Sequence, residues 1–210
     1  MESKLINYNS EVWTFRKIIS KILSVDNLEK IHENVWYDKF DREHDQSSVW
    51  HKKYYDGNNE FLEMYNRFVK NEVKKLFPQE EFIAYQKIPT FRVHLKNNVS
   101  VGEFHRDRDY NHGRSEINFH LPFTNTNESN SIWMESKEDL EDYKPYILKY
   151  GQILMFDGAN LKHGNKLNDS DETRISVDFR VIPFSKYEES EKGSINTHVK
   201  FKIGGYFEKT

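Results

Sequence analysis

Cysteine is absent from this 210-residue chain, and so is any long hydrophobic run. Without cysteine the protein can have no disulfide, no thiolate metal site and no cysteine nucleophile. A membrane-spanning helix needs about 18 consecutive apolar residues, and no stretch comes near that length. The chain starts with the polar residues Met1-Glu2-Ser3-Lys4 and shows no signal peptide. We therefore expect a cytoplasmic protein that does not bind membranes.

A strong charge of either sign is also missing. The formal net charge is −3, from 31 Lys and Arg against 34 Asp and Glu. A net charge this small produces no strong electric field that would attract nucleic acid or an anionic membrane. We therefore expect a small molecule as the substrate. Aromatic residues, in contrast, are frequent, with 12 Tyr, 15 Phe and 4 Trp, unlike in a disordered chain. The composition does not indicate an oligomeric state.

Residues 1–80 are predicted to be mainly helical. Two sets of apolar residues recur with helical spacing and predict two helices: Val12, Phe15, Ile18, Ile19, Ile22 and Leu23, then Phe61, Leu62, Tyr65, Phe68, Val69, Val73 and Leu76. Pro78 ends the second of these. A capping pattern predicts another helix over residues 27–35. The aromatic and polar residues 36–57 have no clear period and are predicted to form a loop.

Residues 81–210 change to the alternating pattern of strands. Strands are predicted at 91–96, 116–121 and 174–181, and shorter ones at 99–104, 132–135, 152–156 and 198–203. Many short strands separated by turn residues favour a sandwich or jelly roll. Helices followed by strands indicate an α+β protein. We therefore expect a single domain, residues 1–210, in which the helical region packs on one sheet of the strand-rich core.

His105 and Asp107 follow a predicted strand, and residues two apart share a face of a strand. His163 comes much later, also just after a predicted strand. Two imidazoles and one carboxylate can bind one face of an iron(II) ion and leave positions open for a 2-oxo acid and dioxygen. The alternatives are a surface pairing of Asp107 with Arg106 or Arg108, and a structural, hydrogen-bonded role for His163.

Arg174 begins the predicted strand 174–181 and shares a face with Ser176, Asp178 and Arg180. So polar a buried face is costly unless its groups have partners. Arg174 and the Ser176 hydroxyl are therefore predicted to anchor the far carboxylate of a dicarboxylic co-substrate. The alternative is an internal ion pair, for instance of Asp178 with Arg180 or Arg174. Asn118 lies on the polar face of the predicted strand 116–121. Its amide could donate to the co-substrate, or it could make an ordinary polar contact within the sheet.

Four further residues are candidates for binding substrate. Arg92 and His94 lie on one face of a strand just before His105 and could point into the core. Trp133 and Glu135 share a face of another strand, and an aromatic wall beside a carboxylate suits a polyhydroxylated or cationic molecule. The alternative for such a tryptophan is an ordinary place in the hydrophobic core.

The order His-x-Asp, distant His and Arg-x-Ser resembles the Fe(II)/2-oxoglutarate-dependent oxygenases. Within them, residues 86–187 resemble the oxygenase-like proteins associated with streptomycin biosynthesis. The resembling segments are 89–95, 102–110, 116–124, 131–136, 156–158, 163–165 and 173–183. The resemblance implies a double-stranded β-helix (jelly-roll) core, with His105, Asp107 and His163 on iron and Arg174 on 2-oxoglutarate.

The resemblance also implies a reaction. We expect a dioxygenase that hydroxylates a small polar metabolite, such as a sugar, an aminocyclitol or an amino-acid-like molecule, and releases succinate and carbon dioxide. Related halogenases lack the carboxylate ligand, so Asp107 favours hydroxylation, desaturation or ring closure. Two other classes stay open: a cupin-like isomerase or hydrolase that uses the same metal ligands, and a non-catalytic jelly-roll binding module.

Overall fold

Two antiparallel sheets form the centre of the protein. The computed structural model describes residues 1–34, 37, 46–101, 103–195 and 198–210. The strands are β1 (Lys4–Asn7), β2 (Ile83–Gln86), β3 (Thr90–His94), β4 (Ile117–Pro122), β5 (Ile132–Met134), β6 (Lys144–Tyr146), β7 (Gln152–Phe156), β8 (His163–Gly164), β9 (Arg174–Pro183) and β10 (Phe207–Lys209). The larger sheet has the order β1-β7-β4-β9-β2-β10, with β3 also paired to β9, and the smaller sheet has the order β6-β5-β8.

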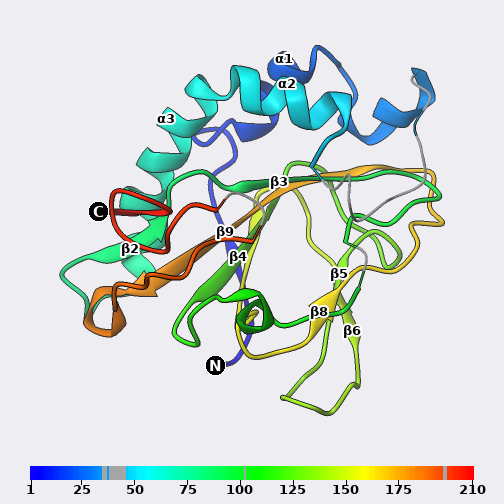
Figure 1. The fold of residues 1–210 in the computed structure, drawn as a ribbon. Helices are drawn as coiled ribbons and strands as arrows, with labels where there is room; N and C mark the ends of the chain where they lie inside the picture. The colour runs from blue at the N-terminus through cyan, green and yellow to red at the C-terminus, as the bar shows by residue number, and fades with distance from the viewer. Residues whose placement is uncertain (35–36, 38–45, 102, 196–197) are drawn as a thin grey trace.

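The helices lie along one side of the larger sheet, and the smaller sheet lies on the other side (Figure 1). They are α1 (Phe15–Leu23), α2 (Val49–Gly57) and α3 (Asn59–Phe68), with short 3₁₀ or π turns at Leu28–Asn34, Val69–Val73, Lys74–Leu76, Asp107–Tyr110 and Phe184–Lys186. The mixed architecture of helices and antiparallel sheet predicted from the sequence is confirmed. None of the described helices combines the length and the apolar character needed to cross a bilayer.

The central strand β9 gives the larger sheet two unlike faces. It pairs with β4, with β3 along its first half and with β2 near its end. Its apolar residues Ile175, Val177 and Phe179 join the buried core that also contains the helices. Because side chains alternate along a strand, the polar residues from Arg174 to Arg180 point the other way, toward the smaller sheet.

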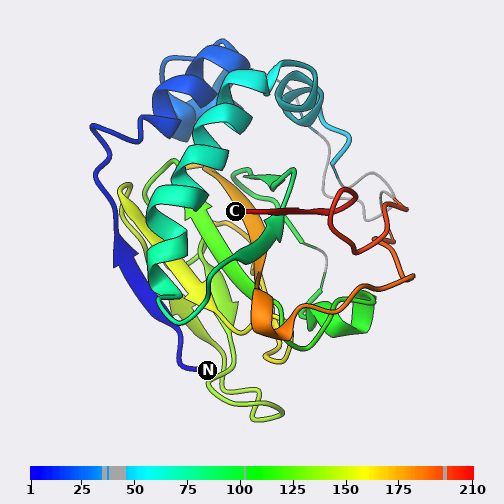
Figure 2. The ribbon, with the colours of Figure 1, turned by 90° about the vertical axis from the view of Figure 1, so that its left-hand side faces the viewer.

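Aromatic rings fasten the helices to the apolar face. Tyr54 of α2 stacks on Phe91 of β3 with ring centroids 4.3 Å apart, and Tyr65 of α3 packs edge-on against Phe179 at 5.1 Å. Phe179 also stacks on Phe119 of β4 at 5.1 Å. Figure 2, viewed from the left of Figure 1, shows α3 beside the strands of the larger sheet. Ring pairs in such arrangements stabilise beyond the area they bury, so the sheet is held firmly against the helices.

The predicted helices are confirmed in part. The first set lies in α1 except for Val12, which precedes the helix in a turn. The second set lies in a helix that changes from α to π and 3₁₀ geometry after Phe68. Residues 28–34 form a 3₁₀ helix rather than an α-helix. The loop prediction for residues 36–57 is wrong over 49–57, because Ser48 caps α2 and Trp50 and Tyr54 give it a buried face. Residues 35, 36 and 38–45 lie outside the described part of the chain.

Five of the seven predicted strands are confirmed at least in part, and two are wrong. The described residues of 99–104 form no strand, since Ser100 is drawn into side-chain contacts instead of a ladder. Residues 198–203 form bends and two isolated bridges instead of a strand, and the φ of His198 is 57°. The sequence also missed five strands: β1, β2, β6, β8 and β10. All five have two to four residues, too few for the alternating pattern to stand out.

The Phe179 ring should be a main support of the fold. Replacing it in Phe179→Ala leaves a cavity between the helices and the sheet, so we expect the free energy of unfolding to fall by about 3–5 kcal/mol. Urea denaturation followed by circular dichroism measures this. The matched control is Val12→Ala, whose side chain is exposed, with an expected change within about 0.5 kcal/mol. Equal losses in the two variants would contradict this account of the core.

Candidate metal centre

His105 and His163 lie side by side because their backbones form a bridge. Each backbone N–H donates to the carbonyl oxygen of the other, at 3.0 and 2.9 Å. Gly164 allows the two segments to come this close, since a Cβ there would lie 3.1 Å from the Phe104 Cα. The imidazole centroids are consequently 4.8 Å apart, although the two residues are far apart in the sequence.

Both imidazole rings are held by a contact between Nδ1 and a backbone carbonyl oxygen. Nδ1 of His105 lies 3.0 Å from the Glu103 carbonyl oxygen, and Nδ1 of His163 lies 3.0 Å from that of Leu161. A carbonyl oxygen only accepts, so each Nδ1 carries the proton and each Nε2 keeps its lone pair. Burial, and then the nearby His105, lower the pKa of His163 to about 4. His163 is therefore neutral near pH 7, the form that binds metal ions.

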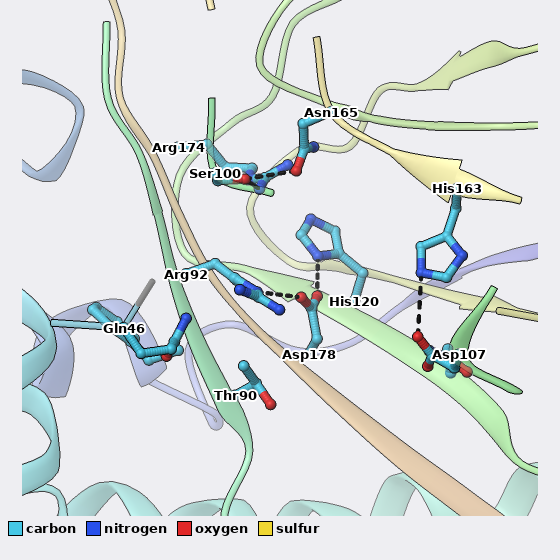
Figure 3. Close-up of polar contacts among 12 residues, drawn as sticks. Gln46, Thr90, Arg92, Ser100, Asp107, His120, His163, Asn165, Arg174 and Asp178 are labelled. Carbon is cyan, nitrogen blue, oxygen red and sulfur yellow. Dashed lines mark hydrogen bonds and ion pairs between the residues drawn. The ribbon is translucent and has the colours of Figure 1, made fainter. Parts of the chain in front are cut away.

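Asp107 completes the group. Its backbone N–H donates to the Gly158 carbonyl oxygen at 3.0 Å, and its side chain is buried. Its Oδ1 lies 3.5 Å from His105 Nε2 and 3.7 Å from His163 Nε2 (Figure 3). One ligand atom from each of the three residues lies within 4.8 Å of the others. The structure thus brings the three predicted ligands together, each with a donor atom directed at a common point.

The second oxygen of Asp107 faces the opposite way. Asn118 Nδ2 donates to Oδ2 at 2.6 Å, and Arg180 contacts the same oxygen through Nε and Nη2, each at 2.7 Å. Burial alone would raise the pKa of Asp107, but Arg180, followed by His105 and His163, lowers it well below its ordinary value. The carboxylate is therefore charged. The Asn118 amide, which was predicted to donate to the co-substrate, donates one hydrogen bond to Asp107 and also lines the cavity described below.

The alternative pairing of Asp107 with its sequence neighbours does not occur. Arg106 pairs with Asp139, and Arg108 pairs with Glu138, both on the loop between β5 and β6. These contacts turn the two arginines outward while Asp107 turns inward.

Arg174 is the first residue of β9, at the opposite end of its polar face from Arg180, and is buried. Its Nη1 donates to the Asn130 carbonyl oxygen at 2.9 Å and its Nη2 to Ser100 Oγ at 2.8 Å. Within the described part of the chain, its Nε and the Ser176 Oγ have no hydrogen-bond partner. Burial lowers the pKa of Arg174 to about 10, against the opposing effect of Asp178, so the guanidinium stays charged near pH 7.

Asp178 does not form the internal pair with Arg174 or Arg180 that was the alternative from sequence. Its Oδ1 accepts from His120 Nδ1 at 2.6 Å, and its Oδ2 lies 3.5 Å from Arg92 Nε (Figure 3). Burial would raise the pKa of Asp178, but His120 and then Arg92 lower it to about 2. This charged group lies between Arg174 and the candidate metal ligands.

A cavity that opens to solvent joins these groups. It is lined by Thr90, Arg92, Val101, His105, Asp107, Asn118, Ile132, Phe156, His163, Gly164, Asn165, Arg174, Asp178 and Arg180. The lining thus comes from both sheets, and it runs from the three candidate ligands to Arg174.

Of the four residues predicted to bind substrate, Arg92 alone belongs to this lining as far as the described residues show. Both ring nitrogens of His94 contact backbone carbonyl oxygens, and Trp133 Nε1 donates to another. Glu135 accepts from two backbone N–H groups. Neighbouring backbone therefore satisfies His94, Trp133 and Glu135, which explains their burial without any ligand.

Sequence reasoning missed two residues of the site. Arg180 was expected on the same strand face as Arg174, but it was not a candidate site residue. Its contact with Asp107 joins segments far apart in the chain, so the sequence does not show it. Gly158 was not singled out among the candidate site residues. A Cβ at Gly158 would lie 2.6 Å from the side chain of Asn118, so this glycine makes room for the amide that contacts Asp107.

No protein-family model matches the chain. SnoK, described as a non-heme α-ketoglutarate-dependent carbocyclase from nogalamycin biosynthesis, matches 100% of this chain and 92% of its own, with a TM-score of 0.62 and 10% identity. CytC3, described with Fe(II) and α-ketoglutarate, matches 98% of this chain and 88% of its own, with a TM-score of 0.51 and 11% identity. The chain therefore shares its fold with these two proteins.

Sequence similarity identifies the family of the chain. The streptomycin biosynthesis protein StrG of Streptomyces griseus is 39% identical over 167 residues, which cover 80% of this chain and 79% of StrG. The chain belongs to the StrG family, and the resemblance found in its sequence segments is confirmed.

The structural role of His94 predicts a pH dependence of stability. Burial, and next the Arg174 cation, lower the pKa of His94 from 6.5 to about 3. The unfolded chain therefore binds a proton at His94 as the pH falls below its ordinary pKa, while the folded chain does not. The stability that His94 contributes is fully present above pH 6.5 and is lost progressively toward pH 3. We expect His94→Gln to flatten this decline by up to about 1.4 kcal/mol per pH unit.

Urea denaturation at several pH values between neutrality and the acid limit of the native state measures the slope. The exposed His198 provides the matched control, His198→Gln. An unchanged slope in His94→Gln, or an equal flattening in His198→Gln, would show that this histidine is not responsible.

Proposed function

We propose that this protein is an Fe(II)- and 2-oxoglutarate-dependent dioxygenase with a jelly-roll core, which hydroxylates a small polar metabolite. The observation that carries the proposal is the convergence of His105 Nε2, His163 Nε2 and Asp107 Oδ1. The description of CytC3 with Fe(II) and α-ketoglutarate, on a similar fold, supports it.

The donor set suits iron(II). Two neutral imidazoles and one carboxylate are the ligands of non-haem iron oxygenases, and three protein ligands leave positions open for other molecules. The Nδ1 contacts with backbone carbonyls fix both rings and direct Nε2 of His105 and His163 at the same point. When bound, the iron would supply the chemistry that couples dioxygen and the oxidative decarboxylation of 2-oxoglutarate, to succinate and carbon dioxide, to oxidation of the substrate.

Arg174 and Ser176 suit the far carboxylate of 2-oxoglutarate. The Arg174 Nε and the Ser176 Oγ are buried donors without a partner among the described residues. A buried donor left unsatisfied costs about 1–3 kcal/mol, so a native protein with two of them on one strand face needs an acceptor there. A carboxylate supplies several acceptor sites. Ser100 and the Asn130 carbonyl oxygen hold the guanidinium in place for it.

The cavity favours a polar substrate. Arg92, Thr90 and Asp178 line it beside the candidate metal ligands, and a guanidinium next to a carboxylate can bind hydroxyl, amino or carboxylate groups. We assign substrate binding to Arg92 on this basis. The description of SnoK as a carbocyclase means that the fold also supports ring closure, so the mass of the product distinguishes hydroxylation from that reaction.

The reaction is tested by adding Fe(II), ascorbate and 2-oxoglutarate aerobically and measuring succinate. We expect succinate from the unaltered protein and none from Asp107→Ala, which removes one of three metal ligands. The anaerobic mixture should also show a visible charge-transfer band of the iron chelate, which the variant should lack. The control Asp56→Ala changes a carboxylate on α2, outside the cavity lining, and should keep both signals.

Other results would favour the rival classes. Metal binding that depends on Asp107 without use of 2-oxoglutarate or dioxygen would indicate a cupin-like isomerase or hydrolase. No binding of iron at all would indicate a non-catalytic binding module.

The anchor is tested by Arg174→Ala. Losing a charge-assisted hydrogen bond costs about 1.5–3 kcal/mol, so the 2-oxoglutarate concentration for half-maximal succinate formation should rise by about ten- to hundredfold. Titration calorimetry of 2-oxoglutarate into the iron-loaded, anaerobic protein should give the same shift, while iron binding itself stays unchanged. An unchanged requirement for 2-oxoglutarate would exclude Arg174 as the anchor.

A further inference from the structure

The two oxygens of Asp107 have separate partners. Oδ1 faces the Nε2 atoms of His105 and His163, and Oδ2 contacts three nitrogens, one from Asn118 and two from Arg180. An arginine that only neutralises a carboxylate commonly forms two parallel contacts, one to each oxygen. Here both arginine nitrogens are on the same oxygen, which leaves Oδ1 free for another partner.

Arg180 is itself held from several sides. Its Nη1 donates to the Tyr206 hydroxyl at 3.1 Å and to Gln86 Oε1 at 3.3 Å. Glu116 Oε2 lies 3.8 Å from its Nε. Burial works against its charge, but Asp107, Tyr206 and Glu116 together raise the pKa of Arg180. The guanidinium is therefore permanently charged and fixed in direction.

Asn118 is equally constrained. Its backbone pairs with Phe156 of β7 and with Arg180 of β9, and its amide lies against Gly158 with no room for a Cβ between them. The same Gly158 accepts the backbone N–H of Asp107. The backbone and the side chain of Asp107 are thus fixed by one group of residues.

We propose that Asn118 and Arg180, together the Asp107 clamp, are positioning residues that reserve Oδ1 as the single metal-binding oxygen of Asp107. This inference rests on the proposed function, because it concerns the same metal site. A carboxylate that turned freely could offer both oxygens to the metal and fill a position that the co-substrate or dioxygen needs. With Oδ2 occupied by three N–H donors, Asp107 also has no oxygen left to act as a base toward substrate.

The clamp and simple charge compensation predict different effects of replacing Arg180 with lysine. Lysine keeps the positive charge but cannot present two N–H groups of a rigid plane to one oxygen. Charge compensation predicts that Arg180→Lys preserves the metal site, and the clamp predicts that it does not.

The test measures binding of Co(II) to the metal-free, full-length protein by titration calorimetry and records the visible Co(II) spectrum, which depends on coordination number. We expect Arg180→Lys to raise the Co(II) dissociation constant by about ten- to hundredfold and to alter the spectrum. Asn118→Ala, which keeps the Arg180–Asp107 pair, should cause a smaller increase. Circular dichroism and thermal melting establish that each variant is folded, and Asn118→Ala still tests the clamp if Arg180→Lys does not fold.

The matched control is Arg16→Lys. Arg16 contacts both oxygens of Glu29, at 2.5 and 2.6 Å, in a partly buried pair outside the cavity lining. This variant should bind Co(II) like the unaltered protein. Equal weakening in Arg16→Lys would trace the effect to general destabilisation and overturn the clamp.

The remaining outcomes separate the clamp from the proposed function. If Arg180→Lys and Asn118→Ala bind Co(II) with the affinity and spectrum of the unaltered protein, the clamp is wrong and the proposed function still stands. If the unaltered protein binds no Co(II), or if Asp107→Ala binds it equally well, the metal site is wrong, and the clamp is overturned together with it.

Discussion

The alternation of side chains along β9 is the constraint on which the rest of the structure depends. One strand supplies both the aromatic and aliphatic residues that hold the helices and the charged residues that line the cavity. A shift of one residue in its pairing with β3 and β4 would exchange the two sets. Burial of Phe179 against Tyr65 and Phe119 makes such a shift costly, so the hydrophobic core also fixes the position of Arg174 and Arg180.

Each buried charge on the polar face has its own arrangement of partners. Arg180 is neutralised by Asp107, and Asp178 is held by His120 and Arg92. Arg174 is held only by neutral groups, Ser100 and the Asn130 carbonyl oxygen, and keeps a donor without a partner in the described chain. Charges in a protein interior are costly unless they are paired. Arg174 is thus a buried cation whose charge is not neutralised by a contacting carboxylate, whereas the neighbouring charges are paired. A binding site for an anion requires such a cation.

The sequence allowed much of this site to be predicted, for definable reasons. The spacing of His105 and Asp107 indicated a common direction, although the strand expected before them does not form. In the structure His105 makes an isolated bridge and Asp107 begins a 3₁₀ turn. Arg174 could be recognised because alternation along one strand is a local property. The contacts of Arg180 with Asp107 and of Gly158 with Asn118 could not be found in this way, because they depend on how distant strands align.

The errors in the fold have related causes. Strands of two to four residues, such as β8, form because another segment lies beside them, and no periodic pattern shows them in advance. The aromatic residues of α2 were taken for a loop because only four positions separate Trp50 and Tyr54, too short a span for a helical period to be clear. His94, Trp133 and Glu135 were candidates because of their residue type, whereas their partners are backbone groups that a sequence does not display.

The contact between Tyr206 and Arg180 joins β9 to a segment 26 residues later in the chain. During translation the three candidate ligands leave the ribosome first, then Arg180, and Tyr206 last. Strand β10, just after Tyr206, also has to pair with β2, far back in the chain, and pairings between distant segments form slowly. A nascent chain can therefore gather its imidazoles and carboxylate before the hydrogen bond between Arg180 and Tyr206 exists.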